Sequence, residues 1–151
     1  MVVIIIVLSC LFIFCIFGLV CSLKATAKRK NLQQQADYNF KNKNGNYQFY
    51  YSIKSFKRGS EVFVKIFTEP VLGFSDLKEA STNRFVNFKI VVNDLEVLPK
   101  IETKGLTAMG EVAIPAECIV NNELKANFTV ETHWHLCGKQ IEDMLTFAYG
   151  G

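Results

Sequence analysis

The chain has 151 residues, which is enough for one domain of ordinary size, and half of its residues are apolar. Its formal net charge of +3 at neutral pH is too small to favour a nucleic-acid-binding protein. The apolar residues are unevenly distributed, because the stretch from Val2 to Leu23 contains no charged residue and no proline. We therefore expect one hydrophobic segment followed by one soluble domain.

Residues 1–23 are predicted to form a transmembrane anchor. As an α-helix, Val2–Leu23 would be about 33 Å long, which matches a bilayer core of roughly 30 Å. A lone segment in lipid must satisfy its own backbone hydrogen bonds, so a helix is expected despite the β-branched residues. A cleaved signal peptide is the alternative, because Ala25-Thr26-Ala27 resembles a cleavage site. The long apolar run and the lack of a preceding basic side chain favour the retained anchor.

Four basic residues follow the apolar run, namely Lys24, Lys28, Arg29 and Lys30. They are expected to meet phospholipid headgroups and to mark the end of the membrane helix. The positive-inside rule would place the following domain in the cytosol, although a viral envelope acquired inside a cell leaves the side open. The sequence thus predicts a single-pass membrane protein and leaves open which side of the membrane carries the domain.

Residues 24–46 are interpreted as a basic juxtamembrane segment and a polar linker. The first polar part, Asn31–Asp37, is suited to extend the membrane helix by about two turns. The second part, Lys41–Asn46, is rich in turn-forming residues and is predicted to be irregular.

Residues 47–151 are predicted to form a mainly β domain. Tyr47–Phe56 and Glu61–Glu69 read as a hairpin around the turn at Lys57–Ser60, and Asp76–Ala80 is a candidate short helix. The further predicted strands are Arg84–Val92, Leu95–Ile101, Glu111–Ile114, Ala116–Val120, Leu124–Leu136 and Met144–Tyr149, with turns at Asn93-Asp94 and Asn121-Asn122 and a loop at Thr103–Gly110. Many short strands favour a jelly-roll or Greek-key-like sandwich or barrel.

Strict alternation in two strands assigns their faces. In Arg84–Val92 the residues expected to face the core are Val86, Phe88, Ile90 and Val92. In Leu124–Leu136 they are Phe128, Val130, Thr132, Trp134 and Leu136, so Trp134 is expected in the core.

The opposite face of Leu124–Leu136 carries the sharpest candidate chemistry, because His133, His135 and Cys137 alternate and can converge. Two imidazoles and a thiolate can bind zinc, with Cys118 or Glu131 as a fourth ligand. A pH-sensitive histidine pair is an alternative, and a plain solvated face is the simplest interpretation. We predict no bound metal and no cofactor. A Cys118–Cys137 disulfide is left open, because two cysteines are no disulfide framework.

Two further motifs bear on function. Asn127-Phe128-Thr129 is an acceptor sequon for N-glycosylation, which matters only if the domain enters the secretory lumen. The sequence has no Gly-rich phosphate loop, no nucleophile elbow and no His-Glu-x-x-His motif. A non-enzymatic protein is therefore predicted.

Two segments give a more specific resemblance. Gly73–Ser81 (Gly-Phe-Ser-Asp-Leu-Lys-Glu-Ala-Ser) and Val92–Ile101, which includes Pro99, resemble segments of the major structural envelope proteins of white-spot-type shrimp viruses. Leu124–Val130 is similar to the long late strand of that family, and the order of an uncharged N-terminal helix before a β-domain is also similar. The chain is shorter than the usual member, and the segment His133–Cys137 is not part of the family pattern.

The resemblance implies a jelly-roll-like barrel on a virion envelope. It implies association with itself, as a trimer in that family, and with other envelope proteins, and a contribution to attachment at a host surface receptor. The implied roles of the matching residues are scaffold roles: Asp76 and Lys78 in the short helix, Asn93-Asp94 in a turn, and Pro99 at a strand end. The alternatives are a cellular membrane-anchored binding or adhesion module, and a secreted β-protein released after signal cleavage.

Overall fold

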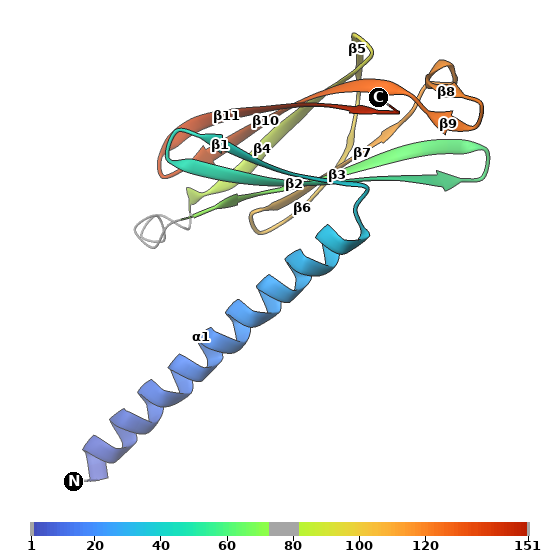
Figure 1. Cartoon of the computed structure of the whole chain (residues 1–151). Helices are drawn as coiled ribbons and strands as arrows, with labels where there is room; N and C mark the ends of the chain where they lie inside the picture. The colour runs from blue at the N-terminus through green and yellow to red at the C-terminus, as the bar shows by residue number, and fades with distance from the viewer. Residues whose placement is uncertain (1, 73–81, 151) are drawn as a thin grey trace. The chain divides into compact units, whose positions relative to one another are not determined.

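A computed structural model of the chain describes residues 2–72 and 82–150, and within its helix it leaves out the side chains of residues 18, 21–26 and 28 (Figure 1). The chain divides into two compact units, Met1–Ala36 and Asp37–Gly151. The predicted helix at Asp76–Ala80 lies outside the described residues.

The first unit is one long helix, α1 (Val2–Gln35). It continues past Leu23 to Gln35, so Asn31–Gln35 extends the helix as expected and only the residues after it leave the helical conformation. Its described large apolar side chains are exposed around the whole circumference, between 41% at Val20 and 76% at Phe14. Among the described residues, no helix has both the length and the hydropathy that a membrane span requires.

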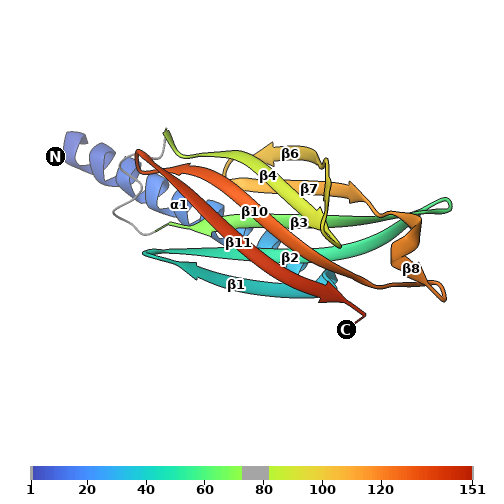
Figure 2. The same cartoon turned by 90° about the horizontal axis from the view of Figure 1, so that it is seen from above.

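The second unit is an antiparallel β-sandwich, which confirms the predicted mainly β fold class (Figures 1 and 2). One sheet has five strands in the order β1-β2-β3-β7-β6, and the other has four in the order β11-β10-β4-β5. The strands of the first sheet are β1 (Tyr38–Asn44), β2 (Tyr47–Arg58), β3 (Glu61–Val71), β6 (Lys100–Lys104) and β7 (Thr107–Ala113). Those of the second are β4 (Arg84–Val92), β5 (Leu95–Val97), β10 (Ala126–Leu136) and β11 (Lys139–Tyr149).

A small two-stranded sheet joins β7 to β10. It consists of β8 (Ile119–Val120) and β9 (Glu123–Leu124), preceded by the 3-10 turn η2 (Ala116–Cys118). The predicted strand Ala116–Val120 is therefore wrong over its first half. Pro115 explains the difference, because a proline cannot donate to a ladder and starts a helical turn without loss.

Two-residue turns connect the paired strands. Gly59-Ser60 joins β2 to β3, and Asn93-Asp94 and Asn121-Asn122 also form turns, as predicted. The loop expected at Thr103–Gly110 is instead the hairpin β6–β7, which turns at Gly105-Leu106 with Lys104 paired to Thr107. Gly105 has a φ of +60°, and this conformation lets so short a turn connect two twisted strands.

The core lies between the sheets and follows the predicted alternation in β10. Its even-numbered side chains, from Phe128 to Leu136, are buried, and the side chain of Trp134 is 1% exposed. The Trp134 ring contacts those of Phe49 at 5.7 Å and Phe85 at 5.1 Å between centroids, so it links both sheets.

The alternation predicted for β4 is wrong at Val86, which is 53% exposed. Asn87 pairs with His133 whereas Phe85 pairs with Trp134, so Val86 is the extra residue of a β-bulge. Because side chains alternate with a period of two, one inserted residue moves Phe85 onto the core face and Val86 onto the solvent face. Phe88 and Ile90, beyond the bulge, are buried as expected.

Strand β1 occupies residues that the sequence assigns to a linker. Its backbone pairs with β2, in the register Asn44 to Tyr47 and Tyr38 to Ile53. Side chains join it to the edge strand β11 of the other sheet: the ring centroids of Tyr38 and Tyr149 are 4.9 Å apart. The segment reads as a linker because its asparagines and lysines resemble turn composition, while their alternation with aromatic residues is short.

Asp37 fixes one end of this β1–β11 contact. Its Oδ2 accepts hydrogen bonds from the Ser55 N–H at 2.7 Å, the Ser55 hydroxyl at 3.0 Å and the Tyr149 hydroxyl at 2.9 Å. Desolvation raises the pKa of the Asp37 carboxyl, but the bonds from Ser55 and Tyr149 lower it by more, so the pKa lies below its usual value of 3.8.

Asp143 on β11 is a buried carboxylate, 1% exposed, that accepts hydrogen bonds from two strands of the opposite sheet. Its Oδ2 accepts from the Tyr51 hydroxyl on β2, and its Oδ1 accepts from the Asn42 amide at 2.9 Å and the Asn44 amide at 3.3 Å on β1. Thr132 Oγ1 lies 3.2 Å from the Tyr51 hydroxyl. Burial, and then the bond to Asp143, raise the pKa of the Tyr51 hydroxyl above its usual value, so it stays a donor.

Tyr51→Phe is expected to destabilise the sandwich by about 1–3 kcal/mol, because the buried Asp143 carboxylate loses a donor and nothing replaces it. Urea unfolding of the purified chain measures the change. Tyr38→Phe is the matched control, since it keeps the ring contact with Tyr149 and removes a hydroxyl that is partly exposed. Equal stability of the two variants would contradict the role assigned to Asp143.

Asp37→Asn is expected to lower the stability at neutral pH and to have no effect in acid. The folded pKa of Asp37 is depressed, so its contribution is complete above the unfolded value of about 3.8 and disappears as the pH falls through the folded pKa. The measurement is the midpoint of urea unfolding for both chains between pH 6 and pH 2. A difference that persists undiminished at the lowest pH would argue against this assignment.

Candidate functional site

A groove lies at one end of the sandwich, where the β2–β3 hairpin extends past the last paired residue of β7. Phe63 pairs with Ala113, and the Ile114 N–H donates to the Val62 carbonyl at 2.9 Å, after which Pro115 diverts the chain into η2 and β8. The space between the hairpin and the diverted segment has a volume of about 540 Å³.

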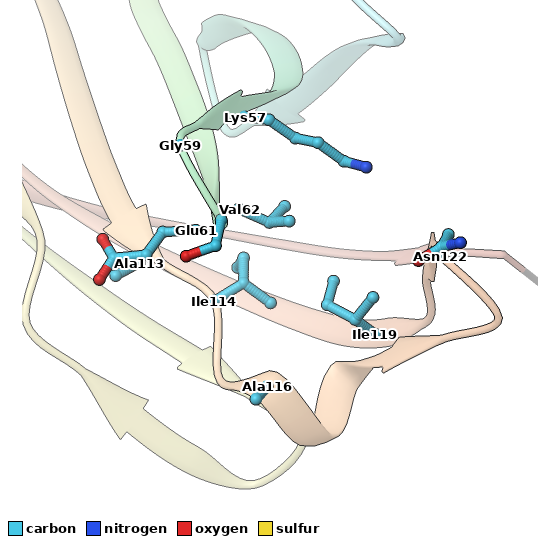
Figure 3. Close-up of a pocket in the computed structure, with 10 residues that line it drawn as sticks. Lys57, Gly59, Glu61, Val62, Ala113, Ile114, Ala116, Ile119 and Asn122 are labelled. Atoms are coloured by element: carbon cyan, nitrogen blue, oxygen red, sulfur yellow. The ribbon is translucent and has the colours of Figure 1, made fainter.

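Apolar side chains form the floor of this end groove. Figure 3 shows Val62, Ile114 and Ile119 pointing into the hollow, with Lys57 along its rim. The residues that line it are Lys57, Gly59, Ser60, Glu61, Val62, Ala113, Ile114, Ala116, Ile119 and Asn122. A second hollow of about 200 Å³ shares Lys57, Val62, Ile119 and Asn122 and adds Leu124 and Phe56. The end groove is suited to an apolar group that carries a polar end.

Sequence reasoning missed this groove. The Asn121-Asn122 turn and the hairpin tip were predicted, but nothing in the sequence brings them together. The only available signal was Pro115, which ends β7 beside Val62 and turns the chain across the open end of the sheet.

The histidine cluster differs from its prediction in composition. His133 lies on the outer face of β10, with its Nε2 2.9 Å from Glu131 Oε1 and its Nδ1 3.5 Å from Glu142 Oε1. Glu142, on the neighbouring strand β11, pairs directly with His133 and was not a predicted ligand. His135 is half-buried on the same face. Its partners on the neighbouring strands are Gln140 and Arg84, and it does not belong to the cluster around His133.

Neither cysteine joins this cluster, so among the described residues the candidate ligands His133, His135, Cys137 and Cys118 are not brought together. Cys118 is buried beside Lys125, whose N–H donates to the Cys118 carbonyl, and Lys125 lies eight residues before His133. At about 3.4 Å per strand residue that is roughly 27 Å. Cys137 leaves the strand with a φ of +51°, because Cys137-Gly138 forms the β10–β11 turn. No disulfide joins Cys118 to Cys137.

The cluster that does exist is Glu131, His133 and Glu142, whose ligand atoms lie within 4.8 Å of one another. Each imidazole nitrogen faces a different carboxylate, and the Glu142 side chain is 69% exposed. A metal site needs one ring nitrogen and the oxygens to converge on a single point. In the observed geometry Nε2 of His133 lies near Glu131 and Nδ1 lies near Glu142, on an open sheet face.

The remaining predicted positions are the basic residues of α1 and the asparagine of the sequon. Lys30 is exposed and Arg29 half-buried on α1, while the side chains of Lys24 and Lys28 are outside the described ones. Asn127 is exposed on β10, where its N–H donates to the Asn93 side chain at 2.8 Å. The sequon is thus accessible from solvent, although it lies within a paired strand opposite Ala148.

Comparison with known proteins identifies no family. No protein-family model and no curated protein matches the chain. Among solved structures it is similar to the GAE domain of GGA2p from Saccharomyces cerevisiae, with 12% identity and a TM-score of 0.39 over 76% of this chain and 98% of that one. The yeast GGA1_GAE domain-P21 structure gives 11% identity and a TM-score of 0.37 over 76% of this chain and 100% of that one. Both TM-scores are below 0.5, so neither structure assigns a family or a function to this chain.

Cys118 is expected to react with iodoacetamide far more slowly than Cys137 in the folded chain. The Cys118 side chain is 4% exposed, and burial raises the pKa of its thiol, whereas Cys137 lies in a surface turn. Mass spectrometry of the peptides after a short labelling pulse measures both rates. Unfolding in urea should make the two rates similar, and equal rates in the folded chain would contradict the burial of Cys118.

Proposed function

We propose that this chain is a non-enzymatic, single-pass membrane protein whose sandwich domain is held beside a bilayer by α1. The exposed apolar side chains of α1 are the observation that carries the proposal. From Val2 to Val20 every described side chain is exposed, and the large ones are aliphatic or aromatic on all sides of the helix. A helix that is apolar all round is stable only where something apolar surrounds it, and a lipid bilayer is such an environment.

A non-catalytic role is supported by the use of the groups that could carry chemistry. The Asp143 carboxylate is occupied by structural hydrogen bonds from Tyr51, Asn42 and Asn44. His133 is held between two carboxylates on an open face and does not line the end groove. A scaffold or binding role needs none of these groups to be reactive.

The more specific form of the proposal is a virion envelope structural protein with a jelly-roll-like domain that takes part in particle assembly and host attachment. It rests on the sequence resemblance of Gly73–Ser81, Val92–Ile101 and Leu124–Val130, of which the first lies outside the described residues. Co-purification of the chain with enveloped particles, and its release from them by mild detergent, is the measurement that tests it.

The second candidate is a cellular membrane-anchored binding module, and the end groove favours it. An apolar hollow of about 540 Å³ with Lys57 at its rim offers a recognition surface that a purely structural shell protein does not need. Absence of the chain from enveloped particles, together with its retention in cellular membranes, would favour this candidate.

The membrane anchor can be tested with the full chain and phosphatidylcholine vesicles. The wild type is expected to float with the vesicles in a density gradient, and Ile6→Lys/Ile13→Lys is expected to abolish flotation, because each lysine costs roughly 3 kcal/mol at the centre of a membrane helix. Val86→Lys is the matched control, as it charges an apolar side chain of the sandwich that is 53% exposed. Flotation of the double variant, or a wild type that stays with soluble protein, would contradict the anchor.

A further inference from the structure

Strand β6 is the edge of the five-stranded sheet, and no described strand pairs with its outer side. All five of its residues, Lys100 to Lys104, are exposed. An open strand edge presents unpaired N–H and C=O groups and is a template for pairing with another chain.

The register shows which backbone groups point outward. The Ile114 N–H donates to the Val62 carbonyl on β3, so the even-numbered residues of β7 direct their backbone groups toward β3. The odd-numbered ones, Thr107, Met109 and Glu111, therefore bond to β6, where they pair with Lys104, Glu102 and Lys100. The backbone groups of Ile101 and Thr103 remain directed away from the sheet.

The side chains along this edge alternate in charge. Lys100, Glu102 and Lys104 share one face of the sheet, and no ion pair is found for any of them among the described residues. A strand whose charges are in the order positive, negative, positive is complementary to an antiparallel copy of itself when the two copies are offset so that a lysine lies opposite a glutamate. Opposite charges directly across an antiparallel pair stabilise it, and like charges destabilise it.

Of three two-fold registers centred on inner residues of β6, one pairs opposite charges without drawing a turn residue into the ladder. Centring on Glu102 places Glu102 against its copy and Lys100 against Lys104. Centring on Thr103 places Ile101 against Gly105, a turn residue with a φ of +60°. Centring on Ile101 places Lys100 opposite Glu102 on both sides, and the outward groups of Ile101 meet those of its copy.

We propose that β6 pairs with β6 of a second copy of this chain, antiparallel and centred on Ile101. In this register the Thr103 N–H meets the Pro99 carbonyl of the second copy, and the Thr103 carbonyl stays open to solvent because Pro99 has no N–H. The Ile101 side chain, 37% exposed, packs against its counterpart. Leu98, 89% exposed, is covered by the aliphatic part of Lys104 of the second copy.

Charged residues on an edge strand also serve to prevent association, and lysine is the common choice. A purely protective edge would not need an acid between its two lysines. Glu102 in that position turns a repelling edge into a self-complementary one, and the exposed Leu98 and Ile101 provide apolar area for the contact.

Sedimentation equilibrium of the full chain in density-matched detergent tests this pairing through a charge swap. Lys100→Glu and Glu102→Lys each place like charges opposite one another, and each is expected to raise the dimer dissociation constant about tenfold. The double variant Lys100→Glu/Glu102→Lys restores opposite charges, so its dissociation constant is expected to return to within about twofold of the wild type. Circular dichroism and thermal unfolding confirm that the exposed substitutions leave the fold intact.

Ile101→Pro provides a second test, because it removes an outward N–H that the β7 ladder does not use. It is expected to abolish the dimer and to leave the melting temperature of the sandwich nearly unchanged. A wild type with one chain per micelle at all concentrations overturns the proposal. It is also overturned if dimers persist in every variant, which assigns association to another surface, or if Lys100→Glu strengthens the dimer, which indicates the register centred on Glu102.

Discussion

The structure of the sandwich depends on a single buried carboxylate. Asp143 lies at 1% exposure on the edge strand β11, and its oxygens accept hydrogen bonds from β1 and β2 of the opposite sheet. A buried charge without partners is unstable, whereas a satisfied one fixes the groups around it. The arrangement therefore orients Tyr51, Asn42 and Asn44, and through Thr132 it reaches the indole of Trp134.

This constraint explains why β1 belongs to the domain. The strand has backbone partners on one side only, in β2, and on the other side it contacts β11 through side chains. Asp37 with Tyr149 holds one end, the pairs Tyr38–Tyr149 and Phe40–Phe147 lie between, and Asn42 reaches Asp143. The two sheets are thereby joined at this edge without a shared ladder.

Much of the fold follows from the sequence where alternation is long and regular. The face of β10, the burial of Trp134 and the turns at Asn93-Asp94 and Asn121-Asn122 are all predicted correctly, because period-two patterns and turn residues are local signals. The bulge at Val86, the strand over Tyr38–Asn44 and the 3-10 turn after Pro115 are missed. Each depends on a partner strand or on a single inserted residue, which a window of sequence does not contain.

The candidate sites were less predictable for the same reason. Glu142 reaches His133 only because the β10–β11 hairpin aligns them, and Cys137 leaves the cluster because it takes a left-handed turn position that usually holds glycine or asparagine. The end groove is built from two segments distant in sequence, residues 57–62 and 113–122, and their apolar residues are indistinguishable from ordinary core residues until the chain is folded.

The position of β1 directly after α1 has a mechanical consequence. Only Ala36 and Asp37 separate the last helical residue, Gln35, from Tyr38, so any pulling force that reaches the sandwich through its N-terminus loads β1 first. That force meets the ladder to β2 along the full length of the strand and the bonds of Asp37 at its beginning. The first strand therefore takes up such a force, held on one side by its backbone bonds to β2 and on the other by a carboxylate and aromatic rings.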